Sequence, residues 1–288
     1  MVNPKSGLPQ SFTALRQALE QYWDLPGTEL TYQFLQSIAD GSAKAARAVL
    51  DGVDTILVAG GDGTINAVGK VLVGTDVSLG VLPTGSGNGF ARHFEIPLSP
   101  AKAAQALASA ETKLIDVGVA NDETFFVTCS MAWDAAFVRS FQKSPVRGVL
   151  PYVFAGVNEF FQYKPQEICV SLDSNEEFCF QNVLVFTVAN MTQYGGGAKI
   201  APQAKEDDGY LELVVALHQD VPMLIANLRR LFDGSLDTLP QVITRRFKTM
   251  TVRRQTHAEI QIDGDLIDMP TELNVHVLPK ALKVLVPR

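Results

Sequence analysis

The sequence predicts an α/β domain followed by a mainly β domain of sandwich type, and three observations lead to this fold class. The chain has 288 residues, 47% of them hydrophobic, which is enough for two ordinary domains with buried cores. Over the first 120 residues, short β-rich runs alternate with runs of helical period, as in a parallel sheet covered by helices. From about Leu114 onward, strand-like runs joined by turn residues dominate. We therefore expect domains at residues 1–118 and 119–288, with segment 279–288 as a candidate to pack back on the first domain.

The first domain alternates between helix and strand patterns. The apolar stripe of the first predicted helix consists of Leu15, Ala18, Leu19 and Tyr22. The predicted strands are TYQFLQS at residues 31–37, TILVA at 55–59 and SLGVL at 78–82. A helix follows TILVA and carries on its apolar stripe Ile65, Val68, Val71 and Leu72. A further helix over Ala101–Ala110 has Ser99 as N-cap and Pro100 at its first position.

The second domain consists mostly of strand-like runs. They are TFFVTC, ICVSL, FCFQNVLVFTVA, YLELVVA, AEIQI, ELNVHVL and ALKVLV. Two stretches with helical spacing, Ser144–Phe161 and Val221–Phe232, interrupt them. The apolar side chains of these stretches favour a place in the core over the lining of an acyl pocket.

Composition and charge exclude several classes of function. The net charge of −7 provides no positive field to attract nucleic acid, so we expect no nucleic-acid partner. Cys129, Cys169 and Cys179 form no CxxC motif and lie far from any pair of histidines. We therefore expect three reduced, buried thiols, with neither a disulfide framework nor a zinc site. The N-terminus lacks the apolar core of a signal peptide, and no uninterrupted apolar run reaches the ~18 residues of a membrane span, which makes the cytoplasm the expected compartment.

The strongest motif is GGDGTIN, placed where a buried strand ends and a helix begins. Its residues are Gly60, Gly61, Asp62, Gly63, Thr64, Ile65 and Asn66. Glycines let the backbone turn sharply and approach a ligand, and the helix N-terminus behind them offers free N–H groups to an anion such as phosphate. A carboxylate beside a phosphate is repulsive unless Mg²⁺ bridges them or the carboxylate handles a proton. Asp62 therefore distinguishes this motif from an ordinary tight turn.

A second glycine-rich loop, PTGSGNGF, follows the next predicted strand. Its candidate ligand-binding residues are Gly85, Ser86, Gly87 and Asn88. Both loops should open at the same carboxyl edge of the sheet, where ligands bind in open α/β folds, and two cradles at one edge suit a nucleoside triphosphate. Neither loop fits GxxxxGK[ST] or GxGxxG, which argues against a Walker-type NTPase and a standard dinucleotide fold. A third candidate is the opening segment NPKSG, Asn3–Gly7.

Together these three motifs resemble the diacylglycerol kinase catalytic-domain family, which includes bacterial diacylglycerol kinases, YegS-type lipid kinases, sphingosine kinases and ceramide kinases. The resemblance spans the whole chain. Further elements in the family's order are LIDVG at 114–118, GGG at 195–197, KEDDGY at 205–210 and IDGD at 262–265. The resemblance implies an NAD kinase/phosphofructokinase-like nucleotide-binding domain and transfer of the γ-phosphoryl group of Mg·ATP to a lipid hydroxyl.

The resemblance also implies roles for individual residues. Contacts to ATP fall to the two loops above and to Asn3, Pro4, Lys5, Ser6, Gly7 and Ser37. A structural Mg²⁺ would be held by Lys205, Asp208 and Tyr210, with the lysine contributing only its carbonyl. Asp62 would organise the catalytic Mg²⁺, Asp116 would support it, and Asp265 would accept the proton of the lipid hydroxyl.

The chain departs from the family's pattern at three places. DGD replaces DGE, which makes the expected base, Asp265, one methylene shorter. Gly89 stands where many members have Asp, so a helix-capping or network carboxylate is missing. Only Met1 and Val2 precede NPKSG, where relatives carry a full strand. We therefore expect a curtailed first strand or a start further upstream.

Two alternatives to a lipid kinase stay open. One is an NAD kinase-like enzyme with a soluble substrate, and the other is a non-catalytic protein of the same fold that binds a lipid or nucleotide. The sequence does not indicate which lipid would be phosphorylated, because acyl pockets are lined by interchangeable apolar side chains. We expect transient, peripheral membrane contact, and a homodimer is left open. The basic clusters available for that contact are Arg229, Arg230, Arg245, Arg246, Arg253 and Arg254.

Overall fold

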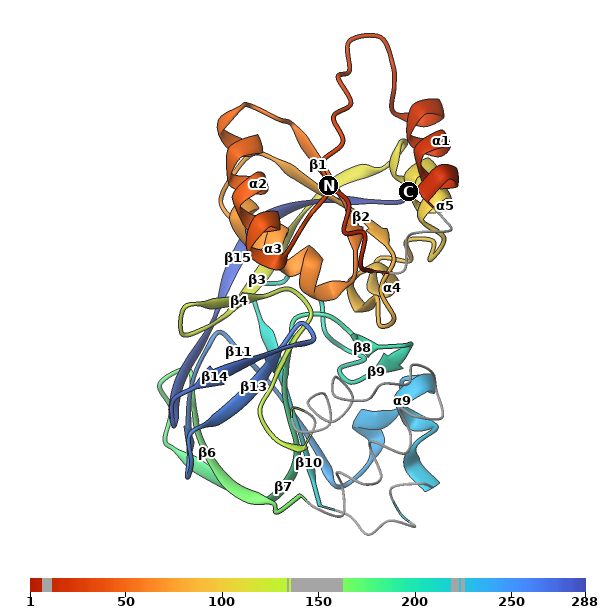
Figure 1. Cartoon of the computed structure of the whole chain (residues 1–288). Coiled ribbons are helices and arrows are strands. Elements are labelled where there is room, and N and C mark those ends of the chain that lie inside the picture. The colour runs from red at the N-terminus through yellow and green to blue at the C-terminus, as the bar shows by residue number, and fades with distance from the viewer. Residues whose placement is uncertain (7–11, 134, 136–162, 219–222, 224–225) are drawn as a thin grey trace. The chain divides into compact units, whose positions relative to one another are not determined.

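The computed structural model describes residues 1–6, 12–133, 135, 163–218, 223 and 226–288, which form two compact units (Figure 1). The first unit comprises Met1–Val117, Gln193–Gly197 and Pro279–Arg288. The second comprises Gly118–Thr192 and Ala198–Leu278. Helices and parallel strands build the first unit, whereas antiparallel strands dominate the second. The predicted fold class is therefore confirmed.

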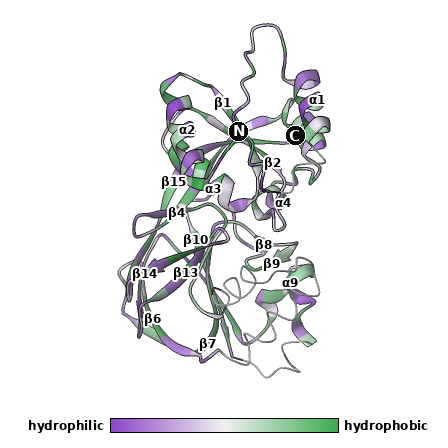
Figure 2. Ribbon diagram, in the orientation of Figure 1, coloured by the Kyte–Doolittle hydropathy of each residue, from purple (hydrophilic) through white to green (hydrophobic). Residues whose placement is uncertain are grey.

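A short parallel sheet forms the centre of the first unit. Strand β1 (Thr55–Gly60) pairs in parallel with β2 (Ser78–Pro83), from Thr55↔Ser78 to Gly60↔Pro83. The other edge of β2 pairs in parallel with the end of β15 (Glu272–Val286). Their apolar runs are almost wholly buried, and Figure 2 shows the hydropathy of the chain along these and the other elements. Two of the three strands expected in the first 82 residues are thus confirmed, each one residue longer than predicted.

The third expected strand, at residues 31–37, is wrong. Only Phe34 forms an isolated bridge there, to Val2, and Val2 also bridges to Ala59. Val2 therefore pairs on both sides, with Phe34 and with Ala59.

The described residues of the first unit form five helices. They are α1 (Phe12–Tyr22), α2 (Ile38–Leu50), α3 (Asp62–Leu72), α4 (Gly89–His93) and α5 (Pro100–Leu107). Helix α2 packs on α3, and α1 packs on α5. The predicted stripe of α1 is buried except for Tyr22, which is half-buried. Helix α5 ends three residues earlier than expected, because a turn at 108–110 must precede strand β3 (Glu111–Ala120), and its N-cap Ser99 makes no side-chain capping bond.

Antiparallel strands make up most of the second unit. They are β4 (Glu123–Phe125), β5 (Thr128–Ser130), β6 (Gln166–Leu172), β7 (Phe178–Ala189), β9 (Ala198–Lys199), β10 (Leu211–Leu217), β11 (Val242–Phe247), β12 (Thr249–Arg254), β13 (Ala258–Ile262) and β14 (Asp265–Met269). The long β7 pairs with β6, β5 and β10, and β12 lies between β6 and β15. Phe125, Phe186 and Phe247 are among the fully buried side chains of its core. The remaining short elements are β8 (Gln193–Gly195), α9 (Arg230–Asp233) and the 3-10 helix η1 (Leu236–Thr238).

The two helical stretches expected in the second half fare differently. Ser144–Phe161 lies outside the described residues. Within Val221–Phe232, the structure describes residues 223 and 226–232, of which the last three belong to the short α9. Leu228 and Phe232 are 45% and 53% exposed. The expectation that this stripe belongs to the core is therefore wrong for these two residues. Among the described helices, none combines the length and apolar character needed to cross a membrane.

The prediction of three reduced cysteines is wrong for two of them. Cys169 on β6 and Cys179 on β7 form a disulfide, and only Cys129 is a buried free thiol among the described cysteines. The two residues stand directly opposite each other in the antiparallel register, which brings their Cα atoms to 3.9 Å. Sequence spacing without the strand register does not reveal this pairing.

Candidate active site

The two glycine-rich loops lie at one edge of the first unit's sheet. Strands β1 and β2 run in parallel and end side by side at Gly60 and Pro83. The backbone N–H of Thr84 donates to the carbonyl of Gly60 over 3.0 Å, so the second loop begins against the end of β1. This confirms the expectation that both loops open at the same carboxyl edge.

The glycines of the loops permit a close approach of two backbones. A Cβ added to Gly85 would lie 2.6 Å from the Cα of Gly61, and one added to Gly61 would lie 3.2 Å from the Cα of Gly85. A Cβ on Gly60 would lie 2.6 Å from the Cβ of Thr64. Real Cβ atoms essentially never come within 3.0 Å of such atoms, so packing alone requires glycine at Gly60 and Gly85, whereas a side chain at Gly61 would force its neighbour to shift. The motif is therefore needed to build the loop pair, before any ligand is considered.

Asp62 joins the two loops. It is the first residue of α3, and its carboxylate accepts hydrogen bonds from the backbone N–H groups of Gly89 (3.1 Å) and Phe90 (3.2 Å) at the start of α4. Burial raises the pKa of Asp62, and the two backbone N–H donors oppose that rise. The same contact explains how the chain manages without a carboxylate at position 89, because Asp62 supplies the acceptor for the first N–H groups of α4.

Asn88 shapes the second loop from within. Its amide oxygen accepts from the N–H of Gly85 (3.0 Å), and its amide nitrogen donates to the carbonyl of Gly85 (2.8 Å). The residue is buried and has a left-handed φ of 49°, a conformation that asparagine tolerates better than most residues. Its side chain therefore holds the loop, while Ser86 is exposed.

The opening segment of the chain contacts both loops. Asn3 donates through Nδ2 to the hydroxyl of Thr64 over 2.8 Å, and its backbone N–H donates to the carbonyl of Ala59. The hydroxyls of Ser6 and Thr84 are hydrogen-bonded at 2.8 Å. The three motifs singled out in the sequence thus meet in one place. Thr84 belongs to this cluster, although the sequence analysis did not select it.

Other residues predicted to bind the nucleotide have different positions. Ile65 is 1% exposed and belongs to the core. Ser37 is the N-cap of α2, where its hydroxyl accepts from the N–H of Asp40 (3.1 Å), rather than the end of a strand. Lys5 is exposed and donates through Nζ to the carbonyl of Gln36, and Pro4 is exposed beside it. Gly7 lies outside the described residues.

Two contacts of the loop cluster were not predicted from the sequence. Gly195, Gly196 and Gly197 all have positive φ angles, and the N–H of Gly196 donates to the carbonyl of Gly87 over 3.0 Å. Arg92 of α4 donates through Nε to the same carbonyl over 3.2 Å. The glycine run was noted only as an element in the family's order, and nothing in the sequence places Arg92 against the loop. The structure thus adds a guanidinium group to the candidate phosphate-binding edge.

Asp116 is fully buried on β3. Its carboxylate accepts a 2.7 Å hydrogen bond from the backbone N–H of Lys280, a residue with a left-handed φ of 51°. This bond ties β3 to β15 within the first unit. The geometry shows Asp116 in a structural contact, and its predicted support of a metal ion stays a prediction.

Asp265 begins β14, directly after a two-residue hairpin turn. Ile262 and Asp265 pair across the turn, and the intervening Asp263 and Gly264 both have positive φ angles, 45° and 93°. An Asp-Gly dipeptide favours this tight turn because both positions require left-handed backbone. Asp265 is exposed at its end. The last residue of DGD thus lies exposed at the end of a hairpin turn in the second unit.

The first aspartate of DGD, Asp263, was not selected in the sequence analysis, although its side chain accepts three backbone hydrogen bonds. Asp263 is 3% exposed, and its carboxylate accepts from the backbone N–H groups of Phe126 (2.7 Å), Val127 (2.9 Å) and Thr128 (3.0 Å). These bonds fasten the β13–β14 turn to the segment leading into β5. The turn formed by Asp263 and Gly264 therefore fixes the position of Asp265.

The residues predicted to hold a structural Mg²⁺ lie in one loop of the second unit. Asp208 accepts through Oδ1 from the N–H of Tyr210 (3.1 Å) and pairs through Oδ2 with Arg246. The guanidinium of Arg246 also lies 4.4 Å above the ring of Tyr210 and 3.2 Å from Glu212, whose pKa burial raises. The Asp208 carboxylate and the carbonyls of Lys205 and Tyr210 would supply oxygen donors of the kind that Mg²⁺ prefers. These residues have the chemistry that the ion requires. Arg246 would compete with the ion for the carboxylate of Asp208.

The basic clusters expected to contact a membrane are only partly available. Arg254 is 7% exposed and donates to the carbonyls of Ala258, Met269 and Pro270. Arg253 pairs with Glu177 and Glu272, and Arg246 is engaged as described above. Arg254 is therefore part of the interior, and the two others are neutralised on the surface.

Comparisons with known proteins match both halves of the chain. Residues 1–120 match the family model of the diacylglycerol kinase catalytic domain, and residues 128–286 match that of the YegS C-terminal NAD kinase beta sandwich-like domain. A diacylglycerol kinase of Mycobacterium tuberculosis is 32% identical over 263 residues, covering 87% of this chain and 84% of that protein. The probable lipid kinase YegS of Salmonella heidelberg is 29% identical over 249 residues, covering 82% of this chain and 79% of the relative.

Solved structures show the same fold. The crystal structure of a diacylglycerol kinase from Bacillus anthracis superposes with a TM-score of 0.74 and covers 99% of this chain and 94% of its own, at 18% identity.

Proposed function

Because the chain belongs to the diacylglycerol kinase family, we propose that it transfers the γ-phosphoryl group of ATP to the hydroxyl group of a diacylglycerol or a related lipid. The chain is a kinase of this family. The observation that carries the proposal is the meeting of three separate motifs at the carboxyl ends of β1 and β2. The use of ATP, the use of Mg²⁺ and the lipid substrate are the proposed parts of this activity.

The loop cluster has the chemistry that phosphate groups require. Gly61–Gly63 are partly exposed at the N-terminus of α3, an 11-residue helix whose dipole favours an anion there. The hydroxyls of Ser6, Thr64 and Thr84 lie in the same cluster. Arg92 would contribute a positive charge beside the second loop, and no described carboxylate forms an ion pair with it. The cluster thus offers donors and charge to the phosphates of ATP.

Mg²⁺, when bound with ATP, would neutralise phosphate charge and polarise the transferred group. Asp62 is proposed to position this ion or its water molecules, since its carboxylate is the acidic group of the loop pair and is fixed by two backbone donors. Lys205, Asp208 and Tyr210 are proposed to hold a second, structural ion.

Asp265 is proposed as the base. In the reaction the lipid oxygen bonds to the γ-phosphorus, the bond from that phosphorus to the β–γ bridging oxygen breaks, and ADP leaves. The hydroxyl proton passes to the carboxylate of Asp265, either directly or through one water molecule. Asp263 supports this role indirectly, because its three backbone hydrogen bonds fix the turn that precedes Asp265.

Lipid access is proposed to involve peripheral membrane contact. The described part of Val221–Asp233 exposes Met223, Leu228 and Phe232 beside Arg229 and Arg230. Exposed apolar side chains next to cations suit the boundary of an anionic bilayer. Vesicle flotation tests this. Binding that weakens in Phe232→Ser and in neutral vesicles supports the proposal, and equal binding by all combinations contradicts it.

A kinase assay with labelled ATP and an array of lipids tests the proposed function. We expect labelled phospholipid from at least one lipid with a free hydroxyl, and loss of that product in Asp265→Asn. NAD serves as the soluble acceptor in a parallel reaction. Phosphorylation of NAD alone would assign the chain to the alternative substrate class, and no transfer to any acceptor by folded protein would contradict the proposal.

A further inference from the structure

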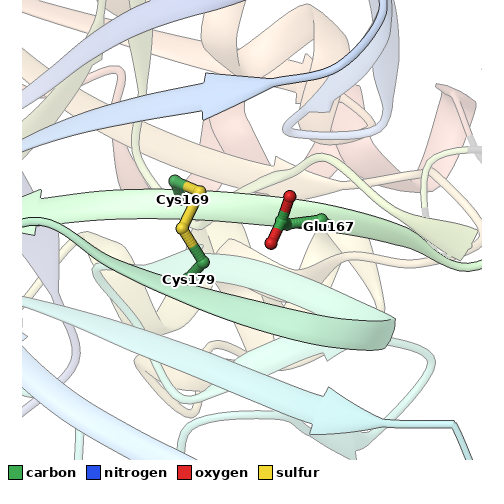
Figure 3. Close-up of side chains that lie close together, drawn as sticks. All are labelled: Glu167, Cys169 and Cys179. Atoms are coloured by element: carbon green, nitrogen blue, oxygen red, sulfur yellow. A yellow bond between two sulfur atoms is a disulfide. The ribbon is translucent and has the colours of Figure 1, made fainter.

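Glu167, Cys169 and Cys179 lie close together on the β6–β7 hairpin (Figure 3). Cys169 and Cys179 face each other across the two strands and form a disulfide. Glu167 precedes Cys169 by two residues on β6, so the two side chains project from the same face of the strand. A carboxylate oxygen and the two sulfur atoms all lie within 4.8 Å of one another.

We propose that this cluster is a redox-gated metal site, closed by the disulfide when oxidised and able to bind a soft or borderline divalent cation such as Zn²⁺ or Cd²⁺ when reduced. Two thiolates and a carboxylate are a donor set that such ions select and that Mg²⁺ does not. Three protein ligands leave a fourth tetrahedral position for water. The site shares no residue with the loop cluster of the first unit or with the loop of Asp208, and it does not depend on the proposed kinase reaction.

The surroundings of the cluster suit both states. Cys179 is exposed, so a reductant can reach its sulfur, and the other two residues are partly exposed. Gln181, two residues beyond Cys179 on β7, donates a hydrogen bond from its side chain to the carboxylate of Glu167 and orients it. Arg253 stands opposite Cys169 on β12, and a neighbouring guanidinium favours thiolate over thiol. Arg253 also forms ion pairs with Glu177 and Glu272. It therefore reduces the negative charge near the cluster but does not occupy the position of the metal ion.

The chemistry of gating is a two-electron reduction followed by metal binding. A phosphine reductant breaks the sulfur–sulfur bond, water supplies the two thiol protons and the phosphine is oxidised to its oxide. The metal ion then displaces both thiol protons and bonds to the two sulfur atoms and to Glu167. Either the disulfide or the metal ion links β6 to β7 at the same pair of residues. In a reducing compartment, where disulfides are rare, the metal-binding form would be the relevant one.

Cadmium titration of the whole chain tests the proposal, because Cd²⁺ bound to thiolates gives an ultraviolet charge-transfer band that carboxylate sites do not give. Protein is reduced with a phosphine, freed of reductant without oxygen, and titrated in parallel with oxidised protein. We expect one Cd²⁺ per reduced chain and no charge-transfer band for the oxidised chain. Cd²⁺ should also displace Zn²⁺ that was bound beforehand, because thiolates prefer the softer ion, and the band should then appear. The affinity of the reduced chain should fall as the pH is lowered, because protons compete for the sulfur atoms.

Variants locate the site. Changes to the hydrogen-bonding partners of metal ligands already cost roughly 10–100-fold in affinity, so Cys169→Ser or Cys179→Ser should cost on the order of 100-fold or more. Glu167→Gln should cost about tenfold, whereas Glu176→Gln, which alters an exposed carboxylate of the same hairpin, should leave binding unchanged. Cys129→Ala removes the remaining cysteine and should also leave it unchanged.

Equal charge-transfer bands in oxidised and reduced wild-type protein would overturn the proposal. An undiminished affinity in the Cys169→Ser/Cys179→Ser double variant would do the same. The comparison of oxidised with reduced wild-type protein decides the question even where a cysteine variant does not fold.

Discussion

Asp62 and Gly89 are joined by a 3.1 Å hydrogen bond from the backbone N–H of Gly89 to Oδ2 of Asp62. The bond connects the β1–α3 turn to the first residue of α4, and a second bond from Phe90 completes the contact. A residue expected to serve the reaction therefore also holds its own loop pair together. Its substitution should change both stability and activity, and the two effects can be measured separately.

Asp62→Asn should lower phosphoryl transfer by on the order of 10²-fold or more, the scale of a lost electrostatic or metal-positioning group. The amide presents an N–H group to one of the two backbone donors, so one donor loses its acceptor, which costs about 1–3 kcal/mol of unfolding free energy. Steady-state kinetics and urea unfolding check the two expectations. Asp76→Asn, which alters an exposed carboxylate paired with Lys283, is the control and should change neither much. Near-normal turnover in a folded Asp62→Asn protein would show that the carboxylate only supports the loops.

The pH dependence of stability should separate wild type from Asp62→Asn. Burial raises the pKa of Asp62 in the folded protein above the ordinary value of about 3.9. A group with a raised folded pKa binds its proton more tightly when folded, so the folded state gains stability as the pH falls through that pKa toward the unfolded value. The variant has no such group. The unfolding free energy of wild type minus that of the variant should therefore increase on acidification through this window, and a constant difference from pH 7 to pH 4 would contradict the raised pKa.

Asp263 should matter more for stability than any other member of the DGD motif. Asp263→Ala leaves three backbone N–H groups without their acceptor and places alanine at a φ of 45°, so we expect a loss of about 3 kcal/mol or more in unfolding free energy. Asp263→Asn keeps a residue that tolerates left-handed backbone and one acceptor oxygen, and should cost less. Urea unfolding measures both variants. A smaller loss in the alanine than in the asparagine variant would contradict this account of the turn.

Mg²⁺ should stabilise the protein in the absence of ATP if Lys205, Asp208 and Tyr210 hold an ion. A ligand of the folded state adds RT ln(1 + [L]/Kd) to the unfolding free energy, so the melting temperature should rise with Mg²⁺ concentration. Asp208→Ala also loses its contact with Arg246, so its melting temperature starts lower. The informative quantity is the increment on adding Mg²⁺, which should vanish in this variant and persist in the control Asp237→Ala. An equal increment in wild type and Asp208→Ala would place the ion elsewhere.

The sequence predicted the parts of this protein that depend on local pattern. Buried apolar runs located β1 and β2, and the parallel pairing of their ends followed from the α/β alternation. The glycine loops could be found for the same reason, because glycine permits the sharp turns and close backbone approach that such loops need. The Asp-Gly turn before Asp265 was also visible as a dipeptide, but its significance depends on N–H groups more than 130 residues away along the chain.

The features that the sequence did not predict depend on tertiary register or on long-range contact. The Cys169–Cys179 disulfide follows from which residues of two neighbouring strands stand opposite each other. The place of Arg92 against Gly87 depends on the short helix α4 folding back on its own loop. Arg254 looked like half of a surface pair with Arg253, yet strand alternation turns it inward, where three carbonyls accept its hydrogen bonds.

Asp265 is where this chain departs from the pattern of its family, and its position at the end of a fixed turn makes the departure testable. A proton acceptor must come within about 2.6–3.2 Å of the hydroxyl oxygen or reach it through one water molecule. Aspartate is shorter than glutamate by about 1.5 Å, one C–C bond. Because Asp263 holds the hairpin turn with three hydrogen bonds, the turn cannot move far to make up that distance.

Proton transfer through a water molecule is therefore the expected route, and a longer side chain should be tolerated. Asp265→Asn should nearly abolish kcat, whereas Asp265→Glu should retain a substantial part of it or exceed it. The measurement is a pair of steady-state assays with the best lipid acceptor at saturating Mg·ATP. Melting curves of both variants confirm folding, and Asp268→Asn, an exposed residue of the same strand, is the matched control. Wild-type kcat in Asp265→Asn would exclude Asp265 as the base and would leave Asp62 as the next carboxylate to consider. Loss of activity in Asp265→Glu as complete as in Asp265→Asn would instead show that the shorter side chain makes direct contact with the hydroxyl.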